Sequence, residues 1–193
     1  GWSVAMSSDG NTIAIGALGQ YNFDDEQDRP DETKERGHVR VYDRDIDNTT
    51  VGWTQVGDDI GEDTRSGYSV AMNSNGTRIV IGANENLNSL PNGGDVRVYD
   101  RDITNITVGW KQVGNTISGT EIGMGASLYR GYSLAMSSDG TIIAIGSPHD
   151  DRPRNDDNSA GSVRVYKLDD AAPNPIRDDL LGAGTGLDIT RYD

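Results

Sequence analysis

Short stretches of alternating hydrophobic and polar residues recur three times along the chain. Each copy starts with a glycine and an aromatic residue and continues through Ser, Val or Leu, Ala and Met, then a polar turn, and then Ile-x-Ile-Gly. The copies begin at Gly1, Gly67 and Gly131, about 65 residues apart. A period of this size indicates that one supersecondary unit is used repeatedly.

Each copy predicts four short strands and no sustained helical period. In the first copy we expect strands over 3–7, 12–16, 39–43 and 52–56. The second strand has apolar residues on both faces, so we expect it to be buried on both sides. The third alternates Val, Arg, Val and Tyr, which is typical of a half-buried strand. Asp9-Gly10 and its counterparts predict two-residue hairpin turns, because Asp, Asn and Gly tolerate positive φ.

Four antiparallel strands in a repeat of about 65 residues match one blade of a β-propeller. We therefore predict an all-β fold of three four-stranded antiparallel propeller blades, a partial propeller, with blades at about 1–66, 67–130 and 131–170. The alternative is a β-trefoil, whose repeats are usually shorter. Residues 171–193 contain two closely spaced prolines and a Gly-rich run, and they predict an irregular linker or tail. The third blade would then lack its fourth strand.

The order of these motifs resembles the FG-GAP-type propeller repeat, the family that includes the integrin α-subunit head. The middle copy has Gly-Tyr-Ser-Val-Ala at 67–71, Ile-Val-Ile-Gly-Ala at 79–83 and Gly-Asp-Val-Arg-Val-Tyr at 94–99. The resemblance covers residues 1 to about 168 and implies a propeller in a secreted or surface protein. Integrin-like members carry an Asp-rich calcium loop between the first two strands. Here that connection is a short hairpin, so the resemblance implies a variant without those calcium sites.

Composition and charge exclude several classes of partner. The chain has 193 residues, a formal net charge of −14 and no cysteine. A surface this acidic disfavours nucleic acid, which is bound by basic surfaces. No apolar run reaches the length of about 18 residues that a membrane-spanning helix needs, so we expect no membrane insertion. The absence of cysteine excludes disulfides and thiol catalysis.

One acidic loop of the third copy is a candidate metal site. Its carboxylates are Asp150, Asp151, Asp156 and Asp157. Carboxylate oxygens are ligands that Ca²⁺ prefers, so calcium is the candidate cofactor, and no other cofactor is expected. Arginines lie among these residues, and they favour the alternative of a solvated acidic loop.

Three Asn-x-Ser/Thr sequons are candidate glycosylation sites. Asn48 and Asn105 occupy equivalent positions between the third and fourth strands, and Asn75 lies in a hairpin turn. A sequon in a surface loop is an acceptor in a secreted protein. We expect Asn48 and Asn105 to carry glycans and Asn75 to be the weaker acceptor, because its side chain lies in a tight turn.

Two other residue types recur at equivalent positions. Trp53 and Trp110 predict packing between blades, with a sugar-stacking platform as the alternative. Arg40, Arg97 and Arg164 predict ion pairs with neighbouring Asp side chains.

These features predict a structural or protein-interaction module that is extracellular or at the cell surface and is not an enzyme. One alternative is a lectin-like module that binds glycans through Trp53, Trp110 and the acidic loops. A polysaccharide-active enzyme is the weaker alternative, since paired carboxylates can hydrolyse glycosides.

Three blades are too few to close a propeller ring, which usually has four to eight. We therefore expect other blades or subunits to cover the terminal blade faces, and the isolated chain not to be a stable monomer. Further blades of a longer parent chain are the favoured source. A second copy that completes a six-blade ring, or neighbours in a polymer, are the alternatives.

Overall fold

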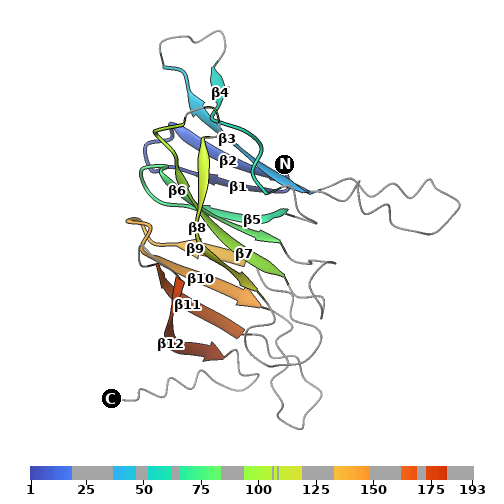
Figure 1. The fold of residues 1–193 in the computed structure, drawn as a ribbon, viewed down its shortest axis with the longest axis vertical. Coiled ribbons are helices and arrows are strands. Elements are labelled where there is room, and N and C mark those ends of the chain that lie inside the picture. Colours follow the sequence, from blue (N-terminus) through green and yellow to red (C-terminus); the bar gives the residue numbers. More distant parts are fainter. Residues whose placement is uncertain are drawn as a thin grey trace, which may run out of the picture.

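The computed structural model consists of β-strands joined by turns. It describes residues 1–18, 37–46, 52–61, 66–83, 94–105, 107, 109–118, 133–147, 162–168 and 173–181. Within these ranges there are strands and turns but no helix, and the strands form three sheets that lie one above another along the long axis of the molecule (Figure 1).

Each sheet has four antiparallel strands that pair in the order of the sequence. The first sheet contains β1 (Ser3–Met6), β2 (Thr12–Ala17), β3 (His38–Arg44) and β4 (Trp53–Gln55). The second contains β5 (Ser66–Met72), β6 (Arg78–Ala83), β7 (Asp95–Arg101) and β8 (Trp110–Ser118). The third contains β9 (Ser133–Met136), β10 (Ile142–Ser147), β11 (Ser162–Leu168) and β12 (Pro173–Leu181).

The fold is all-β and propeller-like, as the repeat predicted. Equivalent residues pair in the same register in all three sheets: Ile15 faces Arg40, Ile81 faces Arg97 and Ile145 faces Arg164. The trefoil alternative is wrong, because the three copies form three separate four-stranded sheets and do not share one barrel.

The prediction of an irregular tail over 171–193 was wrong for residues 173–181. These residues form β12, which pairs with β11 and gives the third sheet its fourth strand. Pro173 is the first residue of this strand, and β12 lies at the edge of the sheet, where a missing backbone N–H is tolerated. This strand was not predicted, because the third copy lacks the Val-Gly-Trp motif that marks the fourth strand in the other two copies. Residues 182–193 lie outside the described part of the chain.

The turns between the first two strands of each sheet are wider than predicted. In the first sheet the backbone N–H of Ser7 donates to the Thr12 carbonyl over 2.9 Å, so four residues separate the closing pair. The N–H of Gly10 donates back to the Ser7 carbonyl, and Gly10 has a φ of 70°. The Ser7 hydroxyl accepts from the N–H of Thr12, and this side-chain contact favours the wider turn over the two-residue turn.

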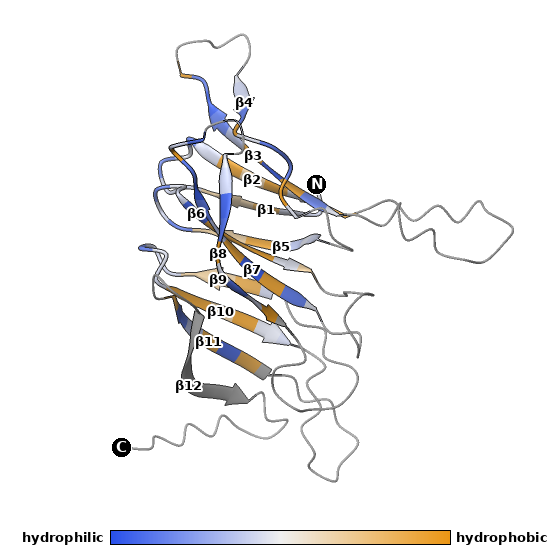
Figure 2. Ribbon diagram, in the orientation of Figure 1, coloured by the Kyte–Doolittle hydropathy of each residue, from blue (hydrophilic) through white to orange (hydrophobic). Residues whose placement is uncertain are grey.

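The hydrophobic core lies in two layers, one on each side of the second sheet (Figure 2). The layer between the first and second sheets contains Ala14, Val39, Val41, Ile60, Val70, Ile79, Ile81 and Trp110. The layer between the second and third sheets contains Ala71, Val80, Val96, Val98, Ile117, Ile143, Ile145, Tyr166 and Leu168. The second sheet is thus covered on both faces. The first and third sheets are each covered by a sheet on one face.

Candidate functional site

The first sheet has an outward face on which none of the described strands packs, and we call it the first end face. It includes Val4, Met6, Ile13, Ile15, Arg40, Tyr42, Arg44, Trp53 and Gln55. The repeat places equivalent residues on the face of the second sheet that packs against the first: Val70, Met72, Ile79, Ile81, Tyr99, Arg101 and Trp110. The first end face is therefore a copy of a face that the molecule already uses for packing.

Equivalent side chains differ in exposure according to whether a sheet covers them. Val4 is 64% exposed and its counterpart Val70 is 9% exposed. Trp53 is 39% exposed and its counterpart Trp110 is 5% exposed. Because the residue types and sheet positions match, the missing neighbour alone explains the difference.

The third sheet has a corresponding outward face, which we call the last end face. It consists of Ala135, Ile142, Ala144, Val163, Val165 and Lys167. Val163 is 37% exposed, whereas its counterparts Val39 and Val96 are both fully buried. The last end face is therefore equivalent to the face of the first sheet that packs against the second sheet.

Backbone hydrogen bonds join the hairpin turns of successive sheets. The N–H of Ser8 donates to the carbonyl of Ser74 over 2.8 Å, and the N–H of Ser74 donates to the carbonyl of Ser138 over 2.9 Å. The Ser3 hydroxyl donates to the Gly67 carbonyl over 2.8 Å. These bonds run in one direction along the stack, so the two sides of each contact are chemically different.

An ion pair also crosses the first contact between sheets. The guanidinium of Arg101 donates to the carboxylate of Asp43, with 2.5 Å between Nη2 and Oδ2. The second contact lacks this pair, because the residue equivalent to Arg101 is Leu168, and Asp100 pairs with Arg78 of its own sheet. One internal contact thus forms without an ion pair at this position.

Glycines allow the first and second sheets to approach closely. A Cβ built on Gly16 would lie 2.2 Å from the carbonyl oxygen of Gly67, which itself has a φ of 84°. Only glycine fits at both positions, because the contact is with backbone that has little room to move.

The carboxylates of Asp9 and Asp139 accept hydrogen bonds within the hairpin turns. The hydroxyl of Ser137 and the backbone N–H of Thr141 donate to Asp139 and lower the pKa of its carboxyl to about 2. The Ser7 hydroxyl and the N–H of Asn11 lower the pKa of Asp9 in the same way. A carboxylate held ionised by such donors is a poor acid or base near neutral pH.

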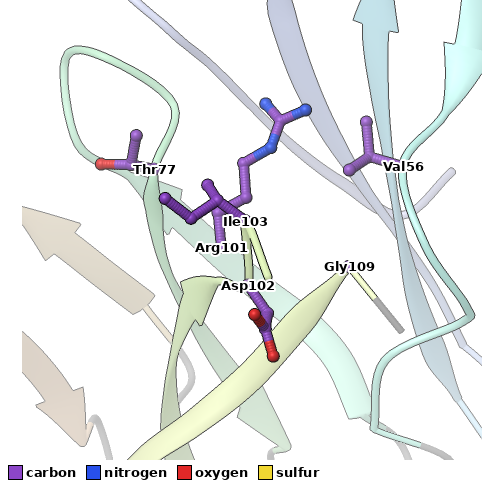
Figure 3. Close-up of a pocket in the computed structure, with 6 residues that line it drawn as sticks. All are labelled: Val56, Thr77, Arg101, Asp102, Ile103 and Gly109. Atoms are coloured by element: carbon purple, nitrogen blue, oxygen red, sulfur yellow. The ribbon is translucent and has the colours of Figure 1, made fainter. Parts of the chain in front are cut away.

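A shallow pocket of about 380 Å³ lies at the outer edge of the contact between the first two sheets (Figure 3). It is lined by Val56, Thr77, Arg101, Asp102, Ile103 and Gly109. Arg101 is paired with Asp43, and the hydroxyl of Thr104 lowers the pKa of Asp102. Arg101 and Asp102 of this pocket therefore take part in bonds that hold the sheets and the turn.

The predicted calcium ligands Asp150, Asp151, Asp156 and Asp157 lie outside the described residues. Among the residues that the structure describes, no group of three His, Asp or Glu side chains could hold a metal ion. Asn48 also lies outside the described part, whereas Asn75 and Asn105 are both exposed on turns. None of the described segments is a helix long and apolar enough to cross a membrane.

The recurring tryptophans and arginines take structural positions. Trp110 lies in the core layer between the first two sheets, which removes it from any sugar-stacking surface. Arg40 forms the predicted ion pair, with two hydrogen bonds of 2.8 Å to Asp59. Arg97 donates to Thr116, the counterpart of Asp59, and lies 3.4 Å from Asp95. Arg164 is buried.

The sequence analysis did not predict the charged residues of the end faces as site residues. The sequence feature that could have identified them lies at the end of the third strand, where the first two copies have Asp43-Arg44 and Asp100-Arg101. The third copy has Lys167-Leu168 instead. Only the packing of the sheets shows that these positions lie at the contacts between blades.

Comparison with protein-family models gave no match, and neither did a search of curated proteins. Among solved structures, the chain is similar to a mutant of prolyl oligopeptidase B from Galerina marginata bound to a 25mer macrocyclization substrate. The identity is 11% and the TM-score 0.47, over 94% of this chain and 21% of that one. The chain thus spans about a fifth of the length of that protein.

This comparison corrects one prediction. The sequence predicted that the chain is not an enzyme, but the solved structure that it resembles is that of an oligopeptidase. The exclusion of enzymatic activity was therefore wrong and is withdrawn. At 11% identity the resemblance concerns the fold and assigns no activity to this chain.

Proposed function

We propose that the chain is a structural and protein-interaction module of the FG-GAP-like propeller type, and that its two end faces are the interaction surfaces. The observation that carries the proposal is the contrast between equivalent side chains. Val70 and Trp110 are buried against a neighbouring sheet, while Val4 and Trp53 are exposed. The equivalent face of the second sheet packs against the first sheet, so a face of this composition is suited to packing against another sheet.

The energy of covering such a face supports this function. Full burial of one Val, Ile or Met side chain contributes about 1.5–3 kcal/mol. Val4 and Met6 are largely exposed, and Ile13 and Ile15 are half-buried. Covering the area that these side chains leave exposed adds a few kcal/mol, which is an appreciable part of a domain's net stability of about 5–15 kcal/mol. This gain in stability supports a function as one part of a larger assembly.

The extracellular location is part of the same proposal. It is supported by the FG-GAP-like order of motifs and by the equivalent sequons at Asn48 and Asn105. A glycan on Asn105 is compatible with covered end faces, because this residue is exposed between β7 and β8, which belong to the middle sheet.

Thiol labelling tests the proposal directly, because the native chain has no cysteine. Val4→Cys places a thiol on the first end face, and the matched control Ile103→Cys places one on a turn where the side chain is 82% exposed. In the protein as secreted by expressing cells, we expect the thiol at position 4 to react at least tenfold more slowly than the thiol at position 103. Both should react alike in urea. Equal reaction rates in the native protein would contradict the proposal.

A further inference from the structure

We propose that Asn75, in the hairpin turn between β5 and β6, is a site of spontaneous deamidation in the folded chain. Asn75 precedes Gly76, and glycine has no side chain to shield the backbone nitrogen that attacks in this reaction. The site does not depend on what covers the end faces, because the turn belongs to the middle sheet.

The reaction needs only two neighbouring residues and water. The backbone nitrogen of Gly76 loses its proton to hydroxide and attacks Cγ of Asn75. A bond forms between this nitrogen and Cγ, the bond between Cγ and Nδ2 breaks, and the released nitrogen takes up a proton and leaves as ammonia. The product is a five-membered cyclic imide. Water then opens the imide at one of its two carbonyl carbons, which gives an aspartyl or an isoaspartyl residue.

Hydrogen bonds hold both reacting groups in this turn, and they must break before the groups meet. The N–H of Gly76 donates to the carbonyl of Asn73 over 3.2 Å. Oδ1 of Asn75 accepts from the backbone N–H of Thr77 over 3.3 Å and from the Thr77 hydroxyl over 2.7 Å. Asn75 is exposed, and among the described residues no side chain or backbone group bonds to its Nδ2. The ammonia can therefore leave directly into solvent.

The equivalent turn of the third sheet holds the same two groups more tightly. The N–H of Gly140 donates to the carbonyl of Ser137 over 2.9 Å. Oδ1 of Asp139 accepts from the Ser137 hydroxyl over 2.6 Å, in addition to the N–H and hydroxyl of Thr141 over 3.0 and 2.9 Å. The middle turn lacks the bond from the serine, because Asn73 takes that position and its amide donates to a threonine hydroxyl. The middle turn therefore releases its reacting groups more readily.

The middle turn also differs from the other two in its chemistry, because it carries an amide. A carboxyl group cyclises in this way only when it is protonated, since an ionised carboxylate has no leaving group. Hydrogen bonds from Ser137 and Thr141 lower the pKa of Asp139 to about 2, and similar bonds lower the pKa of Asp9. Both carboxyl groups are ionised near neutral pH. Of the three equivalent turns, the one with Asn75 is therefore the reactive one.

The two products should affect the fold differently. The aspartyl product fits the turn, because Asp9 and Asp139 already occupy the equivalent position. The isoaspartyl product adds one carbon to the main chain directly after Ser74. The N–H of Ser74 donates to the Ser138 carbonyl, and the Ser74 carbonyl accepts from the N–H of Ser8. The isoaspartyl form should therefore weaken the contacts of the middle sheet with both neighbouring sheets.

Asp139→Asn supplies a matched comparison within one molecule. It gives residues 138–141 the same sequence as residues 74–77, Ser-Asn-Gly-Thr. Gly76 and Gly140 are both buried, so burial of the attacking nitrogen does not bias the comparison. The purified whole chain with this substitution is incubated at pH 8, either folded or in urea. Trypsin then releases residues 66–78 and 131–154 as separate peptides, and mass analysis of their fragments measures deamidation at each position.

In the folded chain we expect position 75 to be converted about fivefold faster than position 139, the factor that corresponds to one hydrogen bond of typical net strength. In urea the two positions should react at equal rates, because their local sequences are identical. The peptide of the Asn75→Asp variant identifies the aspartyl product, and the isoaspartyl peptide has the same mass but separates from it by chromatography. Equal or reversed rates in the folded chain overturn the proposal, as does a folded chain in which position 75 is not converted.

Discussion

The same position of the hairpin turn is held by Asp9 in the first copy, Asn75 in the second and Asp139 in the third. Asn75 accepts hydrogen bonds from the backbone N–H and the hydroxyl of Thr77, just as Asp139 accepts from those of Thr141. The turn therefore needs an acceptor at this position and does not need a charge.

This equivalence predicts the effect of Asp9→Asn with Asp139→Asn on acid stability. The folded pKa of Asp139 is about 2, below its usual value of 3.8, and that of Asp9 is also lowered. A lowered folded pKa stabilises the native state above pH 4 and loses that contribution as the pH falls toward 2. The double variant lacks this contribution, so it should be slightly less stable than wild type at pH 7 and should lose less stability between pH 4 and 2.

Thermal melting of the two proteins across this pH range measures the difference. The middle copy is the internal control, because it already carries Asn75 and its turn should be insensitive to acid. Parallel pH profiles for the wild type and the double variant would show that the turn carboxylates do not contribute.

Glycosylation is predicted to differ between the exposed asparagines. Asn105 is exposed on the turn between β7 and β8, whereas the side-chain oxygen of Asn75 accepts from the Thr77 hydroxyl over 2.7 Å. We expect a glycan on Asn105 and none on Asn75 in protein from a eukaryotic secretory route. Peptide mass analysis before and after glycosidase treatment decides this, and Asn105→Gln should remove the shift. A glycan on Asn75 alone would refute the expectation.

At the scale of the strands and turns, the close approach of Gly16 to the second sheet makes a prediction. Gly16→Ala should destabilise the chain by about 1–3 kcal/mol, since the new Cβ would meet the Gly67 backbone. Gly146 has the same position in the third sheet, but there a Cβ would meet mainly the Ser133 side chain, which can turn away. Gly146→Ala should therefore cost less. Equal losses in urea unfolding would contradict this account of the contact.

The two equivalent tryptophans make a matched pair. Trp110→Ala removes a side chain buried between the first two sheets and should cost about 3–5 kcal/mol. Trp53→Ala removes a partly exposed side chain and should cost less than about 1 kcal/mol in the unassembled chain. Chemical denaturation of each variant below the assembly concentration gives the two values. The reverse order would mean that Trp53 is already covered within one chain.

Much of the element structure could be predicted from the sequence. The strands expected at 12–16 and 39–43 correspond to β2 and β3, and the pattern Val39, Arg40, Val41 predicted the alternating burial of β3. The expectation that β2 is buried on both sides was wrong, because its residues alternate between buried and partly exposed positions. β12 was missed because it carries prolines and lacks the repeat motif. The turns were predicted too tight because the bond between Ser7 and Thr12 depends on side-chain geometry that periodicity does not encode.

At the scale of the whole molecule, the repeat predicted how many sheets form, and only the structure shows which faces they leave open. The third strand reads Val-Arg-Val in each copy, yet Arg40 is exposed in the first sheet and Arg164 is buried in the third. The difference arises because the first and third sheets are covered on opposite faces. No sequence pattern of one copy contains this information, since it depends on the place of that copy in the stack.

We infer that a partner covers the first end face in the native protein, since Val4 and Trp53 are exposed where their counterparts Val70 and Trp110 are buried. Thiol labelling of Val4→Cys in the secreted protein, with Ile103→Cys as the control, measures whether position 4 is covered. We predict that the thiol at position 4 reacts at least tenfold more slowly than the thiol at position 103, and that both react alike in urea. Equal rates in the native protein would contradict the inference.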